Sequence, residues 1–159
     1  MVQRISRAWT SDANHDRPRL LVEDPSGPLA DAEFEEFESA GFDVAVCTGP
    51  ERAQGCSLVD SGHCALAEQA DVILFGLTLA DESRRDVVRA LRRRFPATPV
   101  VVEVPLREAD CEEAVPRGCR ALALPTSIQG EVWAARQALE GARRARALLR
   151  ESPLDRGDR

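Results

Sequence analysis

Apolar residues gather in five short runs along the chain, and stretches with a different spacing separate the runs. Unbroken apolar runs of about four to eight residues are typical of buried strands in a parallel sheet. We therefore expect strands at residues 19–23, 42–47, 71–77, 98–104 and 119–124. The longer segments between and after them repeat apolar side chains every three or four positions. This spacing predicts helices at residues 29–40, 81–95, 107–115 and 126–150.

Five apolar strands alternating with helices predict an α/β fold, in which helices cover both faces of a parallel sheet. This is the doubly wound, flavodoxin-like plan with strand order 2-1-3-4-5, whose ligand sites lie at the carboxyl ends of the strands. One part departs from the plan: residues 48–70 form an irregular Cys-containing segment in place of the second helix, closed by a helical turn at 65–70. We expect the domain to span residues 18–151, after a flexible leader at 1–17 and before a flexible tail at 152–159.

The composition is that of a globular protein, with 43% hydrophobic and 30% charged residues among 159. A net charge of −6 argues against a nucleic-acid partner, because binding to phosphates needs a surplus of positive charge. No apolar run approaches the roughly 18 residues of a membrane span. Five cysteines cannot all pair within one chain, which favours a reducing, cytoplasmic location.

Four stretches give the chain a resemblance to a known family: LLVEDP at 20–25, DVILFGLTLAD at 71–81, TPVVVEVP at 98–105 and GCRALALP at 118–125. In order and spacing they resemble the CheY-like receiver domain of bacterial two-component response regulators, over roughly residues 19–150. In that family an acidic pair after the first strand binds Mg²⁺, and an Asp ending the third strand accepts a phosphoryl group. A hydroxyl residue ends the fourth strand, and a Lys ends the fifth.

The resemblance implies that most of this machinery is missing here. The acidic pair corresponds to Glu23 and Asp24, but the acceptor corresponds to Gly76, the hydroxyl to Val104 and the Lys to Leu124. All 21 basic residues are Arg, so no Lys elsewhere can substitute. We therefore expect a pseudo-receiver: no enzyme, but a signalling domain that acts on a protein partner. The acidic pair is either a leftover metal site or a solvated strand end.

The segment CTGPERAQGCSLVDSGHC contains three cysteines, and the topology predicts that they share one end of the domain. Cys47, Cys56 and Cys64, with His63, could bind zinc, and the thiols could hold an iron–sulfur cluster. A thiol at a helix N-terminus has a lowered pKa, which suits a redox switch or a disulfide. Alternatively, the cysteines are small buried hydrophobes, because their spacing matches no common metal motif.

Three further features have two interpretations each. Trp133, on the last helix, is either a partner or homodimer contact or a residue at the edge of the core. Trp9 is either a docking element or part of a disordered leader. The arginines of the helix at 81–95, Arg84 among them, form a solvated outer face or meet an acidic partner. A small-ligand-binding domain of flavodoxin-like type is the remaining alternative.

Overall fold

The computed structural model describes residues 5–9, 16–23, 31–47, 56–77, 80–111 and 113–151. Asp24 and the predicted tail lie outside these ranges. Five strands of the sheet run parallel in the order β3-β2-β4-β5-β6, which confirms the predicted order 2-1-3-4-5. Their bounds are Arg19–Glu23 for β2, Asp43–Cys47 for β3, Val72–Gly76 for β4, Val100–Pro105 for β5 and Arg120–Leu124 for β6.

A sixth described strand, β1 (Ile5–Arg7), lies within the leader that we expected to be flexible, so this expectation is wrong for these residues. The strand pairs antiparallel with β3 and places Ile5 opposite Cys47. Without β1, the outer side of β3 would present a row of unpaired backbone groups. Three residues are too few to show a strand pattern in the sequence, and only the neighbouring edge makes the strand favourable.

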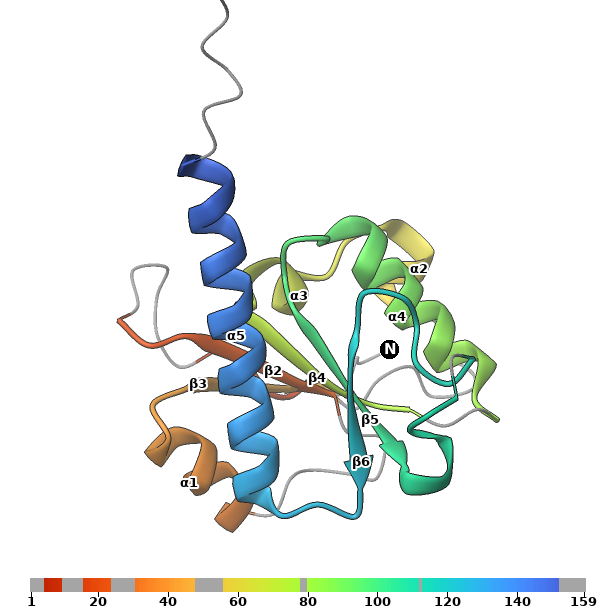
Figure 1. Cartoon of the computed structure of the whole chain (residues 1–159), viewed down its shortest axis with the longest axis horizontal. Helices are drawn as coiled ribbons and strands as arrows, with labels where there is room; N and C mark the ends of the chain where they lie inside the picture. The colour runs from red at the N-terminus through yellow and green to blue at the C-terminus, as the bar shows by residue number, and fades with distance from the viewer. Residues whose placement is uncertain are drawn as a thin grey trace, which may run out of the picture.

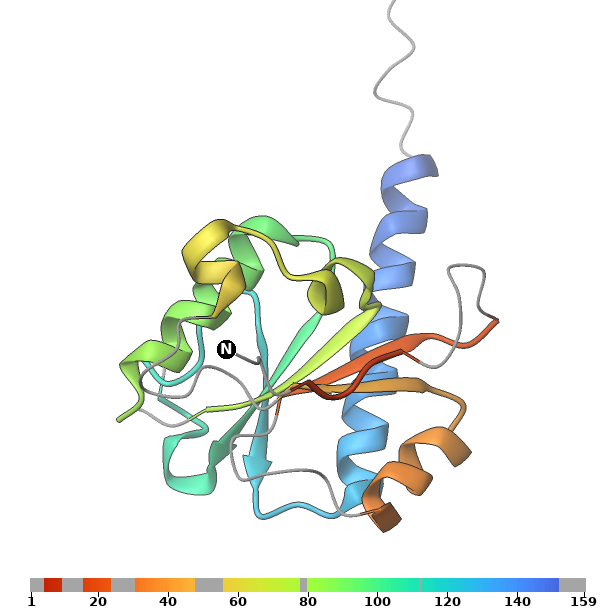
Figure 2. The same ribbon diagram turned by 180° about the vertical axis from the view of Figure 1, so that it is seen from behind.

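Helices cover both faces of the sheet (Figures 1 and 2). One face carries α1 (Asp31–Ser39) and α5 (Ile128–Glu151), and the other carries α2 (Ser57–Ser61), α3 (Ala65–Gln69) and α4 (Glu82–Arg94). The predicted helices at 29–40, 81–95 and 126–150 are confirmed as α1, α4 and α5. Within the described ranges, no helix is both long and apolar enough to cross a membrane.

The central strands are buried on both sides, and alternate residues belong to different cores. In β4, Val72 and Leu74 pack with α1 and α5, whereas Ile73 and Phe75 pack with α2, α3 and α4. This arrangement explains the unbroken apolar runs, because both faces of a parallel sheet must be apolar when helices cover both.

The helix predicted at residues 107–115 is wrong. The structure has one 3₁₀ turn, η1 (Leu106–Glu108), followed by tight turns in which the N–H of Cys111 donates to Glu108 and the N–H of Ala114 to Cys111, both at 3.0 Å. Short helices depend on burying an apolar face, and this segment supplies little apolar surface. Residues at the start of β6, the edge strand, are exposed at Arg120 and Ala121.

The segment between β3 and β4 is irregular, as predicted, but more helical than the sequence indicated. The turn predicted at 65–70 is confirmed as α3, and α2 precedes it. The two helices are separated at Gly62, whose φ of 75° ends α2 in the left-handed region that glycine adopts without strain. A single longer helix is therefore replaced by two five-residue pieces.

Trp9 packs on the amino-terminal end of the sheet. It is half-buried against the core that α2, α3 and α4 cover, and the Arg19 guanidinium carbon lies 5.4 Å from its ring centroid. Arg19 itself is buried; its Nη1 donates to the side chain of Gln69 at 2.7 Å, and its Nε lies 3.6 Å from Asp43 Oδ2. The structure thus favours a packing role for Trp9 over a disordered leader or a docking element.

Candidate functional site

The described residues that the resemblance matches to the phosphorylation machinery lie along the carboxyl edge of the sheet. Glu23 ends β2, Gly76 ends β4, and Leu124 ends β6, one residue after the position paired with Val104 of β5. Val104 is fully buried and Leu124 half-buried. Since neither side chain has an oxygen or nitrogen atom, Glu23 supplies the only side-chain charge among these four positions.

The charge that faces Glu23 comes from Arg84 in the first turn of α4. Arg84 is only 5% exposed, so the prediction that it belongs to a solvated outer face is wrong. Its Nη2 donates to Glu23 Oε2 at 2.5 Å, and its Nε donates to the Gly76 carbonyl at 3.0 Å. Arg84 is buried because it lies three, four and seven positions before Val87, Val88 and Leu91, on the inner face of the helix.

Two further groups surround the Arg84 guanidinium. Asp81 caps α4 by accepting the Arg84 N–H at 3.1 Å, and its Oδ2 lies 3.9 Å from Arg84 Nε. The ring of Phe75 lies under the cation, with its centroid 5.0 Å from the guanidinium carbon. A buried charge is tolerated only when it is paired and hydrogen-bonded, and Arg84 meets both conditions. The acidic end of β2 therefore already holds a cation that is part of the chain.

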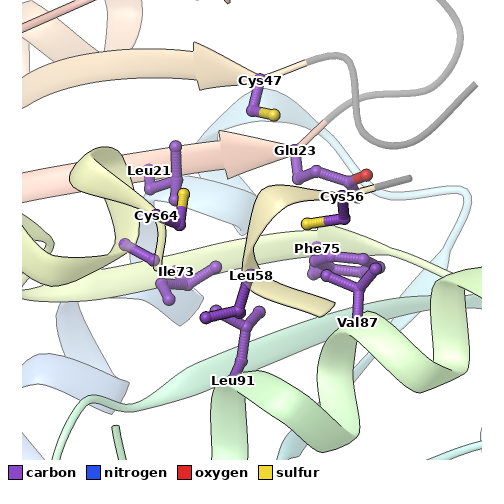
Figure 3. A pocket seen from close by; sticks show the side chains of 11 residues that line it. Leu21, Glu23, Cys47, Cys56, Leu58, Cys64, Ile73, Phe75, Val87 and Leu91 are labelled. Carbon is purple, nitrogen blue, oxygen red and sulfur yellow. The ribbon is translucent and has the colours of Figure 1, made fainter. Parts of the chain in front are cut away.

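The three cysteines predicted to share one end of the domain line one pocket. Cys47, Cys56 and Cys64 border it together with Glu23 and apolar side chains from the sheet and from α4 (Figure 3). The pocket is small, with a cavity volume of about 30 Å³. It lies on the opposite side of the sheet from α1 and α5, under α2 and α3.

Among the described residues near these cysteines, no set of metal ligands forms. His63 is exposed and its Nδ1 lies 3.3 Å from Glu68 Oε1. In the ranges that the structure describes, no three His, Cys, Asp or Glu side chains are grouped so that they could hold a metal ion. The zinc and iron–sulfur interpretations stay predictions. All five cysteines are free thiols, so the structure holds no disulfide between them.

The structure also places Cys56 at a helix N-terminus, that of α2, and the pKa of its thiol is raised, not lowered. Burial raises the pKa of the Cys56 thiol, and the nearby backbone N–H groups of Leu58 and Val59 oppose the rise without cancelling it. Cys56 caps a helix of only five residues, so its surroundings act more strongly than the helix dipole. A thiol that keeps its proton is a poor nucleophile, which argues against Cys56 as a redox-reactive residue.

Sequence comparison identifies no relative of this chain: no family model matches it, and neither does any curated protein. Solved structures, in contrast, match most of the chain. A CheY-like response regulator receiver domain from Methanospirillum hungatei JF-1 has a TM-score of 0.61 at 13% identity, covering 82% of this chain and 99% of its own. The receiver domain of the Francisella response regulator 1452 has a TM-score of 0.57 at 22% identity, covering 79% of this chain and 98% of its own. A transiently phosphorylated switch in bacterial signal transduction has a TM-score of 0.57 at 18% identity, covering 80% and 98%.

This chain has the receiver fold. The likeness extends over most of the chain, so the resemblance drawn from its four stretches is confirmed at the level of the fold. At these identities the likeness concerns the path of the backbone. The chemistry of the site depends on which side chains occupy the carboxyl edge of this receiver fold.

The residue that sequence reasoning missed at this edge is Arg84. Its signal was present, because an Arg at an inner position of an apolar helical stripe needs a buried partner. Among six arginines in residues 84–94, however, the sequence could not single it out.

Trp133, on α5 of the receiver fold, is 56% exposed, with the Arg120 guanidinium carbon 5.3 Å from its ring centroid. Its role in a partner interface stays a prediction.

Proposed function

We propose that this chain is a receiver-like signalling domain that accepts no phosphoryl group and acts through protein contacts. The observation that carries the proposal is the position of Arg84, whose guanidinium is hydrogen-bonded to both Glu23 and the Gly76 carbonyl. A cation of the chain itself thus occupies the acidic end of β2.

Covalent phosphorylation of the family's kind needs a carboxylate at the end of the third parallel strand, and Gly76 has no side chain. Stabilising the transferred group also needs positive charge and hydrogen-bond donors at its oxygens. Leu124 and Val104, at the corresponding positions, offer neither. These substitutions support a site that neither forms nor holds an acyl phosphate.

The ion pair also opposes binding of Mg²⁺. A divalent cation at Glu23 would have to displace Arg84 and leave its guanidinium buried without its carboxylate partner. Breaking one side of a buried ion pair costs about 3–5 kcal/mol. Mg²⁺ loses its bound water reluctantly and is usually held by one or two carboxylates. Coordination by Glu23 alone would therefore not offset the loss of the ion pair.

Exposed apolar side chains on α5 support action through protein contacts. The helix projects beyond the sheet (Figures 1 and 2), and its last turns carry Leu148 and Leu149, which are 69% and 78% exposed. The apolar stripe of the helix extends into its projecting end through Ala138, Ala142, Ala145 and Leu149. Exposed apolar surface of this kind marks contact sites, and we propose that this end of α5 pairs with a second copy or another protein.

The proposal is tested by incubating the protein with acetyl phosphate and Mg²⁺ and measuring the intact mass. A phosphorylatable receiver domain treated in parallel shows that the reagent is active. We expect no added phosphoryl group on this chain. The matched variant is Asp81→Asn, which removes the second carboxylate beside Arg84, whose Oδ2 lies 3.9 Å from Arg84 Nε. A phosphoryl adduct that is stable at neutral pH and lost in Asp81→Asn would make Asp81 the acceptor and refute the proposal.

A further inference from the structure

Many of the basic residues of this chain gather at one end of the domain. Three segments contain arginines and neither Asp nor Glu: residues 87–102, 114–130 and 141–150. They belong to the last turns of α4 with the start of β5, to β6 with its flanking turns, and to the projecting end of α5. The chain as a whole has a net charge of −6, so this end differs in sign from the protein that carries it.

The three segments meet in the folded protein. Arg146 on α5 donates from Nη2 to the carbonyl of Ala97, in the turn before β5, at 2.7 Å. Arg92 on α4 donates from Nη1 to the carbonyl of Thr98 at 2.9 Å, and a Cβ on Gly118 would lie 3.1 Å from Arg92 Nη2. Backbone carbonyls thus hold these two guanidinium groups in place without neutralising their charge.

We call this surface the arginine end and define it by six side chains: Arg93, Arg94, Arg117, Arg143, Arg146 and Arg150. All six are exposed, and none of them forms an ion pair with a carboxylate of the described residues. Their positive charge is therefore available to a group from outside the chain.

The opposite charge gathers on α1. Its sequence, DAEFEEFES, has acidic side chains and no basic one, and residues 20–51 around it contain no Arg. Phe34 and Phe37 bury one side of the helix, and Glu35 and Glu36 on its other side are exposed. Figures 1 and 2 show α1 and the projecting end of α5 at opposite ends of the molecule. The two charged surfaces therefore cannot meet within one chain.

We propose that the acidic side of α1 in one copy of this chain docks on the arginine end of a second copy. The inference rests on the contact role proposed above for the end of α5, and it names the partner. Contact of the arginine end with itself would place cation against cation, and contact of α1 with itself would place carboxylate against carboxylate. Only a head-to-tail contact pairs opposite charges. Such a contact leaves one surface of each copy free, so the assembly grows or closes into a ring.

The strength of this contact depends on several charges acting together. One exposed ion pair contributes little, because water and salt screen it and two long side chains lose their freedom. Leu148 and Leu149, which lie between Arg146 and Arg150 in the chain, add exposed apolar area to the same surface. We therefore expect weak association that falls as the salt concentration is raised.

Two complementary variants of the full chain test the docking by sedimentation velocity at low salt. One combines Glu35→Arg with Glu36→Arg and leaves the arginine end intact. The other combines Arg143→Glu with Arg150→Glu and leaves α1 intact. All four positions are exposed, so the fold should persist. We expect the unaltered protein to form oligomers, each variant alone to lose them, and an equimolar mixture of the two variants to form dimers. The mixture pairs the intact α1 of one variant with the intact arginine end of the other.

The matched control combines Asp110→Arg with Glu113→Arg, which makes the same change in net charge at exposed positions after η1 and should leave association unchanged. An equal loss of association in this control, or a mixture that stays monomeric, would overturn the proposal. An unaltered protein that is monomeric at low salt would also overturn it, and binding of polyglutamate or DNA would then identify another polyanion as the partner of the arginine end.

The salt dependence separates this inference from the function on which it rests. At about 1 M NaCl the Debye length is about 3 Å, so a contact between exposed charges should be lost. Association that persists unchanged at this salt concentration would overturn docking by charge and would leave an apolar contact at the end of α5. The experiment with acetyl phosphate is independent of either result.

Discussion

Arg84 Nη2 lies 2.5 Å from Glu23 Oε2, although 61 positions separate the two residues in the chain. The pair ties the first turn of α4 to the last residue of β2, and both side chains are about 95% buried. An internal cation thus neutralises the acidic end of the central strand. The same strand begins with a second buried cation, Arg19, which is held by Asp43 and Gln69. The two ends of β2 are therefore both fixed by charges from other elements.

Removing one member of the pair should be costly. We expect Arg84→Ala to lower the free energy of unfolding by about 3–5 kcal/mol, because it leaves the Glu23 carboxylate buried without its cation. Urea denaturation measures the loss. Arg93→Ala, at an exposed position of the same helix, should change stability by no more than about 0.5 kcal/mol. Equal effects of the two substitutions would show that the pair contributes nothing specific.

A double substitution separates the ion pair's contribution to the free energy of unfolding from the contribution of the packing around it. Glu23→Leu combined with Arg84→Leu removes both charges, and replacing a buried ion pair by apolar residues is often neutral or stabilising. We expect the double variant to be more stable than Arg84→Ala in the same urea series. If it is as unstable as the single variant, the loss comes from packing and not from the stranded carboxylate.

Cys119 makes stability depend on pH in the alkaline range. Burial raises the pKa of its thiol from 9.0 to about 11, against the opposing charge of Arg92. The unfolded chain releases this proton near pH 9 and the folded protein only near pH 11, so the thiol's contribution is complete below pH 9 and falls as the pH rises from about 9 to about 11. We expect Cys119→Ala to flatten this part of the decline in urea-unfolding free energy. An unchanged slope in the variant would contradict the assignment, since Cys56 titrates in the same direction in both proteins.

Truncation of Trp9 should lower the free energy of unfolding more than truncation of Trp133. Trp9→Ala removes a half-buried ring and its contact with the Arg19 guanidinium, and we expect a loss of about 1–2 kcal/mol in unfolding free energy. Trp133→Ala is the matched control, because Trp133 is mostly exposed, and it should cost less. A larger loss from Trp133→Ala would place the structural tryptophan on α5 instead of near the amino terminus.

We expect the projecting end of α5 to contribute to self-association and not to the stability of the fold. We expect Leu148→Ser combined with Leu149→Ser to weaken self-association in sedimentation velocity while changing the unfolding free energy by no more than about 0.5 kcal/mol. Ala147→Ser, at an exposed position on the same turns, should leave association unchanged. A chain that is monomeric at every concentration would refute pairing with a second copy. Contact with a different protein would then be the remaining role for the two leucines.

The sequence by itself determined the five parallel strands, their order and the three long helices, because periodicity is a local property and both faces of the sheet had to be apolar. It also shows that Gly76, Val104 and Leu124, which the resemblance matches to the phosphorylation positions, carry no carboxylate, hydroxyl or amine. Only the tertiary structure decided that Arg84, among its neighbours on α4, faces Glu23, that β1 covers the edge of β3, and that three thiols surround an apolar pocket. Those relationships join residues far apart in the chain, and their partners are fixed only when the elements pack together.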